Sequence, residues 1–150
     1  MSPILQFLFR PTEAPRSVLL VRIAVGLIFF TQGILKYIDP NLGVVRFTRI
    51  GFPNPHFTAH FVGASEILCG LLLLLGLGTR LASFPLLIVI MTAIATTKIP
   101  ELFRANQGFW YMVSDARTDF GMLCCLVFLI LVGGGGWSLD ARLARHDQKS

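Results

Sequence analysis

The sequence predicts an all-α integral membrane protein, built as a four-helix bundle with short interfacial segments in its two long loops. Of the 150 residues, 54% are hydrophobic and only 14% are charged, whereas an average soluble domain has about 25% charged residues. The apolar residues gather in four runs of about membrane-crossing length. The three cysteines are few and odd in number, which argues against a disulfide scaffold.

The four runs cover residues 17–38, 57–77, 81–97 and 118–136. A helix of about 20 residues crosses the hydrocarbon layer, and backbone groups in lipid must form their hydrogen bonds within the segment, so each run is expected to be a helix. The last run reaches this length only if its four terminal glycines extend it. Tails (1–16 and 137–150) and two long loops (39–56 and 98–117) complete the predicted domain plan.

The basic residues outside the spans predict the orientation of the chain. Six of them flank the side that holds both termini, and five flank the other side. This excess favours cytoplasmic termini in the inner membrane of a bacterial or archaeal cell. Basic flanks beside anionic lipid explain the net charge of +5, so no nucleic-acid partner is expected.

Charged residues inside the first span mark its predicted bundle-facing side. Two cations, two glycines and an aromatic residue follow one another at spacings of four and three residues: Arg22, Gly26, Phe29, Gly33 and Lys36. This spacing places them on one helical stripe. Glycines on such a stripe allow a second helix to approach closely.

Glu66 lies near the middle of the second span, with Gly63 and Gly70 on its own face. An unpaired carboxylate at this depth would take up a proton, so Glu66 must be neutral, paired or in contact with water. Arg22 and Lys36 are both candidate partners. Two interpretations stay open: a structural ion pair, for which Arg22 and Glu66 are the candidates, or a proton relay or polar group at a ligand pocket.

Other polar residues lie near the ends of the spans. His56 and His60 are four residues apart and could ligate a metal or haem, but no third ligand is evident, so no metal site is predicted. Asp119 could cap the fourth helix, where the dipole favours a carboxylate, or line a polar site with Arg117. No nucleotide-binding or hydrolase motif occurs, and no catalytic residue is assigned.

Three motifs follow one another at residues 22–36, 66–80 and 136–140. In order and spacing they resemble the DoxX family of small bacterial and archaeal membrane proteins, and the resemblance covers most of the chain. It implies a four-helix membrane bundle. The family takes its name from a subunit associated with a terminal quinol oxidase. Related proteins are described as the membrane part of a thiosulfate:quinone oxidoreductase, or in membrane-bound redox complexes with soluble partners.

The resemblance favours a membrane subunit of a respiratory or redox system that binds quinone or anchors a soluble oxidoreductase partner. Such a subunit is expected to do little chemistry alone and to hold no cofactor besides a quinone. Five residues are the candidates for the quinone site or proton relay: Glu66, Lys36, His60, Asp119 and Gln32. The alternatives are a structural or assembly subunit of a larger membrane complex and a small-solute transporter. The lipid bilayer and other subunits, in a hetero- or homo-oligomer, are the expected partners.

Overall fold

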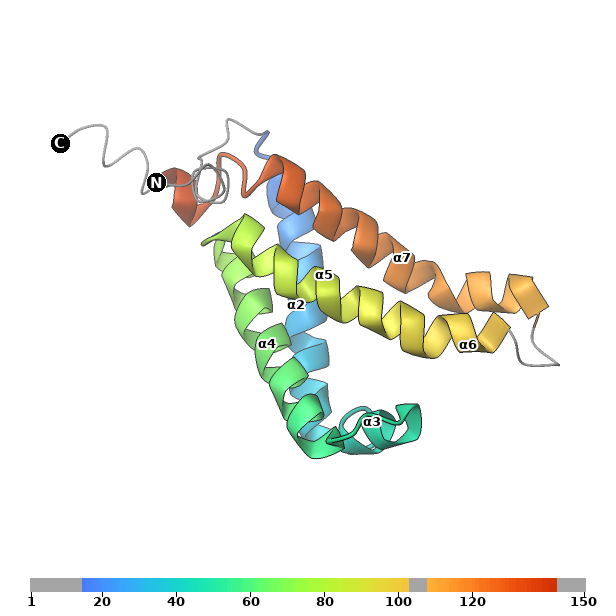
Figure 1. Cartoon of the computed structure of the whole chain (residues 1–150). Helices are drawn as coiled ribbons and strands as arrows, with labels where there is room; N and C mark the ends of the chain where they lie inside the picture. Colours follow the sequence, from blue (N-terminus) through green and yellow to red (C-terminus); the bar gives the residue numbers. More distant parts are fainter. Residues whose placement is uncertain (1–14, 103–107, 143–150) are drawn as a thin grey trace, which may run out of the picture.

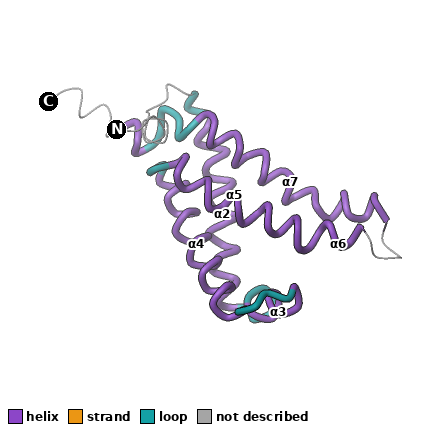
Figure 2. The backbone as a smooth tube through the Cα atoms, in the orientation of Figure 1, coloured by secondary structure: helices purple, strands orange, loops and turns teal. Residues whose placement is uncertain are grey.

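The structure of the protein, a computed structural model, describes residues 15–102 and 108–142. Within these residues the regular elements are all helical and no strand occurs (Figure 2), so the predicted all-α class is confirmed. The elements are α2 (Val18–Ile38), α3 (Val44–Ile50), α4 (Pro55–Leu75), α5 (Thr79–Ala93), the π-helix η1 (Ile94–Lys98), α6 (Ile99–Leu102) and α7 (Gly108–Val132).

Three helical stretches are long and apolar enough to cross a membrane: Val18–Ile38, Pro55–Leu75 and Thr79–Lys98. They coincide with the first three predicted spans. α7 is the fourth long helix, with 25 residues. Because Asp115, Arg117 and Asp119 lie within it, its uninterrupted apolar part is restricted to residues 120–132. α7 is therefore the fourth long helix, but it is not among the three described helical stretches that meet the length and hydropathy required of a membrane span.

The start of α7 corrects the predicted bounds of the fourth span. The helix begins at Gly108, well before residue 118, and the short helix α6 occupies residues 99–102. Much of the segment predicted as a loop is therefore helical. Hydropathy marked only the apolar half of α7, because charged residues interrupt the half that precedes it.

The end of α7 also differs from the predicted end of the fourth span at residue 136. The helix stops at Val132, because Gly133 and Gly135 have φ angles of 84° and 74°. These left-handed conformations end a helix and suit glycine, which has no Cβ atom. The glycine run therefore terminates the helix instead of lengthening it to residue 136.

The long helices form two antiparallel pairs (Figure 1). α2 packs along α4, and α5 packs along α7. The pairs meet where α2 and α5 begin and where α4 and α7 end, and from there they diverge (Figure 1). We call α2, α3 and α4 the first arm, α5, η1, α6 and α7 the second arm, and the shared end the junction. α3 lies at the free end of the first arm.

The first arm is held by close contact between α2 and α4 at two glycine pairs. A Cβ atom on Gly70 would lie 2.8 Å from the backbone nitrogen of Phe30 and 2.9 Å from the carbonyl oxygen of Gly26. A Cβ atom on Gly33 would lie 2.8 Å from the carbonyl oxygen of Gly63. Such distances are too short for real contacts, so glycine permits this approach of the two backbones. The glycine stripes predicted in the first two spans face each other.

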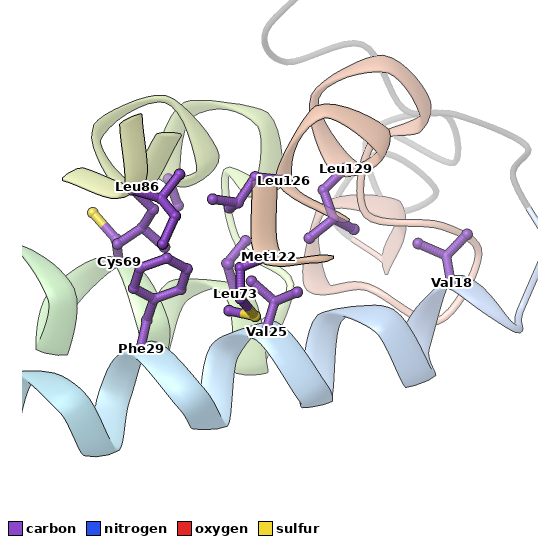
Figure 3. Packing of buried hydrophobic residues seen from close by; sticks show 11 residues of the cluster. Val18, Val25, Phe29, Cys69, Leu73, Leu86, Met122, Leu126 and Leu129 are labelled. Carbon is purple, nitrogen blue, oxygen red and sulfur yellow. The ribbon is translucent and has the colours of Figure 1, made fainter. Parts of the chain in front are cut away.

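The apolar core lies beside the junction and joins the two arms (Figure 3). Its buried side chains come from all four long helices: Val25 and Phe29 of α2, Cys69 and Leu73 of α4, Leu86 of α5, and Met122, Leu126 and Leu129 of α7. Because lipid tails are as apolar as these side chains, close packing contributes more than the hydrophobic effect to this contact.

Gly70→Ala tests the close approach of α2 and α4. The added methyl group meets backbone atoms of α2, so we expect the protein in detergent to lose about 1–3 kcal/mol of unfolding free energy. Gly121→Ala on α7 is the matched control, because nothing lies within 4 Å of a Cβ atom there. The control should be neutral or slightly stabilising. Equal melting temperatures for the two variants would contradict the glycine contact.

Candidate functional site

Arg22 lies on α2 at the junction, with only 1% of its surface exposed. Its guanidinium donates hydrogen bonds to four backbone carbonyl oxygens: Leu73 at 2.9 Å, Leu74 at 3.3 Å, Gly134 at 2.6 Å and Trp137 at 3.3 Å. Leu73 and Leu74 belong to the last turn of α4, where carbonyl groups have no donor within the helix. Arg22 therefore closes the end of α4 and ties it to the segment that follows α7.

Gly76, directly after α4, leaves the space that this guanidinium occupies. Its φ angle is 71°, and a Cβ atom there would lie 2.5 Å from Arg22 Cζ. The backbone N–H of Gly76 donates to the carbonyl oxygen of Leu72 at 2.8 Å and closes the helix. Both the left-handed backbone and the lack of room require glycine at this position.

Asp140 fastens the segment after α7 to the start of α5. Its carboxylate accepts hydrogen bonds from the backbone N–H groups of Gly78 at 2.9 Å and Thr79 at 3.3 Å. Its own N–H donates to the carbonyl oxygen of Gly76 at 3.1 Å. A carboxylate in this place caps a helix and complements its dipole. No local sequence pattern indicates this contact, because Asp140 and Gly78 are 62 residues apart in the chain.

Lys36, which is partly buried, and Glu66, which is buried, form an ion pair between α2 and α4. Lys36 Nζ donates to Glu66 Oε2 at 2.5 Å, and 11% and 4% of the two side chains are exposed. Of the two cations considered as partners of Glu66, Lys36 takes this position, whereas Arg22 is bound to carbonyl groups at the junction. The structure therefore does not form the Arg22–Glu66 pair. Helical periodicity placed both cations on one stripe but did not determine which lies level with Glu66.

A second cation acts on Glu66 from outside the two long helices. α3 packs against α4, and the positive charge of Arg46 on α3 acts on the Glu66 carboxylate through space. From the sequence, Arg46 is only one of the five basic residues that flank the side opposite the termini. The ion pair of Glu66 is with Lys36, and the charge on α3 acts only at longer range, which no single helical pattern could indicate.

Tyr37 and His60 lie together in the same arm. The Tyr37 hydroxyl donates to the carbonyl oxygen of His60 at 2.7 Å, and the two rings meet edge to face with centroids 5.2 Å apart. His60 Nδ1 lies 2.7 Å from the carbonyl oxygen of His56, and both histidines are exposed. Within residues 15–102 and 108–142, no group of three His, Cys, Asp or Glu residues could hold a metal ion.

Asp119 lies in the other arm, where Lys98 of η1 pairs with two carboxylates of α7. Lys98 forms a close ion pair with Asp115, and its Nζ lies 3.7 Å from Asp119 Oδ2. Because α7 begins at Gly108, Asp119 lies well inside the helix. The interpretation of Asp119 as a cap of this helix is therefore wrong.

The structure brings together some of the five predicted polar candidates and separates others. Lys36 and Glu66 are in direct contact, and His60 belongs to the same arm as they do. Gln32 is an exposed residue of α2. Asp119 belongs to the second arm, which diverges from the first (Figure 1). The candidate site is accordingly the Lys36–Glu66 pair with Arg46 beside it.

The sequence profile of the DoxX family matches residues 17–99, more than half of the chain. The chain belongs to the DoxX family. An uncharacterized membrane protein of Mycobacterium tuberculosis is 49% identical to this DoxX chain over 139 residues, which cover 89% of this chain and 85% of the relative. CatD of Bacillus subtilis, named as a candidate oxidoreductase, is 33% identical over 122 residues, 81% of this chain and 83% of CatD. No solved structure matches the chain significantly.

Arg22→Gln should destabilise this DoxX protein much more than loss of an exposed arginine. Glutamine cannot supply donors to four carbonyl groups, so we expect a loss of about 3 kcal/mol or more of unfolding free energy. Arg22→Lys should be intermediate, because one ammonium group cannot replace the planar guanidinium. Thermal melting in detergent measures the effect, with Arg142→Gln as the control, because Arg142 is exposed. Similar melting of Arg22→Gln and the control would refute the junction's dependence on Arg22.

Proposed function

We propose that this DoxX protein is the membrane subunit of a respiratory or redox system and that it binds a quinone at Lys36 and Glu66. The observation that carries the proposal is the buried contact between an ammonium and a carboxylate, 2.5 Å apart, on two membrane-spanning helices. Charged groups within spans are costly and usually mark a pathway for ions, protons or ligands.

The contacts of Lys36 leave it able to bind a ligand. An ammonium group has three hydrogen-bond donors, and the described contacts of Lys36 use its nitrogen for a bond to Glu66. A remaining donor can bind a quinone carbonyl oxygen. By contrast, the guanidinium of Arg22 is engaged with four carbonyl groups of the chain itself. Of the two stripe cations, Lys36 is therefore the one suited to a ligand.

The proposed chemistry assigns one task to each residue of the site. Reduction of a quinone to a quinol consumes two electrons and two protons. Lys36 holds one carbonyl oxygen of the quinone, and Glu66 transfers one proton to and from that oxygen. The second proton is exchanged with water at the other quinone oxygen. His60, which is exposed in the same arm, exchanges protons with water. A soluble oxidoreductase partner supplies or receives the electrons.

The relatives support a redox function, and the distribution of basic residues supports the orientation of the protein in the membrane. CatD, which is similar to this chain over 81% of its length, is named as a candidate oxidoreductase. This supports a redox function for the present protein. We place the protein in a bacterial inner membrane with both termini in the cytoplasm. In this orientation Lys36, near the end of α2, lies toward the outer face.

The second candidate function is that of a structural or assembly subunit in a larger membrane complex. The observation that favours it is that Lys36 and Glu66 join α2 to α4. In this case the pair specifies the contact between two helices and binds no ligand.

Glu66→Gln distinguishes the two functions. We expect purified wild-type protein with decylubiquinone as the probe to show a carboxyl band in the infrared difference spectrum between reduced and oxidised quinone. This band should vanish in Glu66→Gln, because the amide cannot take up or release the proton. Asp115→Asn, in the second arm, is the matched control and should retain the band. Size-exclusion chromatography should show that all three proteins stay monodisperse.

The opposite pattern would favour the structural function. Decylubiquinone would then leave the melting temperature of the wild-type protein unchanged, and no carboxyl band would depend on Glu66. Glu66→Gln would instead reduce the copurification of partner subunits from native membranes. A double variant, Lys36→Gln with Glu66→Gln, leaves no unpaired charge in this pair and would restore assembly if pairing alone matters.

A further prediction concerns the origin of the electrons. If a partner supplies them, the isolated subunit should carry no stoichiometric haem, flavin or redox metal. Visible absorption and elemental analysis of the purified protein measure this. A chromophore present in a one-to-one ratio would overturn the assignment of electron transfer to a partner.

A further inference from the structure

One side of α3 is apolar and packs against the protein. Another side is basic, and its arginines form no ion pair with the described residues. Phe47 is buried and packs edge to face on Phe52, with ring centroids 5.4 Å apart. Arg46 and Arg49 are three residues apart, so both project from one face of the helix. Arg49 is exposed and Arg46 is half-buried. Neither arginine forms an ion pair with a carboxylate of the described residues.

The neighbouring acidic groups do not neutralise these two arginines. Glu66 is bonded to Lys36, and the charge of Arg46 acts on a carboxylate that is already paired. Asp39 accepts hydrogen bonds from the backbone and side-chain nitrogens of Asn41, within its own turn. Three cations, Lys36, Arg46 and Arg49, stand against two carboxylates, Asp39 and Glu66, so the corner formed by α2, α3 and α4 carries one net positive charge.

The position of α3 in the fold indicates which kind of anion is available to bind at this corner. α3 lies between the end of α2 and the start of α4, two helices that can each cross a membrane. Tyr37, Phe57 and Phe61 are exposed at these helix ends, as is common for aromatic side chains in the interface between hydrocarbon and water. In the orientation proposed above, this corner lies in the outer leaflet, and the anions at this depth are the phosphate groups of phospholipids.

We propose that Arg46 and Arg49 bind the phosphate of an anionic phospholipid, such as phosphatidylglycerol. A guanidinium presents planar, paired donors that match phosphate oxygens, and two guanidinium groups on one helical face can hold one phosphate between them. The bound phosphate offsets the charge of Arg46 on α3, which packs against α4, so the lipid changes the charge balance near the Lys36–Glu66 pair. The lipid site stands on α3 alone and does not depend on quinone binding.

Native mass spectrometry of the purified full chain tests this site. We expect wild-type protein to retain phosphatidylglycerol in preference to phosphatidylcholine of the same chain length. Arg46→Gln and Arg49→Gln should each weaken this preference about fivefold, because each removes one cation from the phosphate. The matched control is Arg117→Gln, an exposed arginine in the second arm, which should keep the wild-type preference. Melting curves should show that all variants are folded.

Three results would overturn the proposal. Arg117→Gln could lower the preference as much as Arg49→Gln does, which would indicate general attraction to a basic protein. The two α3 variants could retain the wild-type preference, which would place the lipid elsewhere. Inorganic phosphate could raise the melting temperature of lipid-free protein as much as phosphatidylglycerol does, with the same loss in both variants. The site would then take free phosphate instead of a lipid.

Discussion

The carbonyl groups at the end of α4 set the constraint on which the junction depends. The last turn of a helix has carbonyl groups without donors of its own, so a helix end buried in the protein must find donors there. Arg22 supplies them and at the same time binds the segment after α7. Gly76 has to be glycine because the guanidinium occupies the space of a side chain. Asp140 then holds that same segment against the start of α5.

Two kinds of buried charge occur within residues 15–102 and 108–142. At the junction, the guanidinium of Arg22 binds backbone carbonyl groups, and this arrangement has little capacity for anything else. In the first arm, Glu66 is bonded to Lys36, and the ammonium group keeps donors available. The first kind fixes the relative positions of helices, whereas the second can respond to a proton or a ligand. Charges of the first kind stabilise the fold, and charges of the second kind form the candidate site.

Local patterns predicted the features that depend on local periodicity. Run length indicated the helical class and the first three spans, and the spacing of Gly26 and Gly33 predicted the face that meets α4. The partner of Glu66 could not be derived, because Arg22 and Lys36 share one stripe and differ only in depth. The cap that Asp140 forms on α5 joins residues far apart in the chain, and no periodic signal marks it. The early start of α7 was missed because hydropathy does not detect a helix with interspersed charges.

The divergence of the two arms gives the protein unequal widths at its two ends (Figure 1). At the junction four helix ends gather around one core, whereas at the opposite end α3 and α6 stand apart (Figure 1). Within a bilayer, the protein therefore displaces a different area in each leaflet, as a wedge does. A change in the angle between the arms would alter this difference in area. A protein of this shape would therefore fit a curved bilayer differently from a flat one.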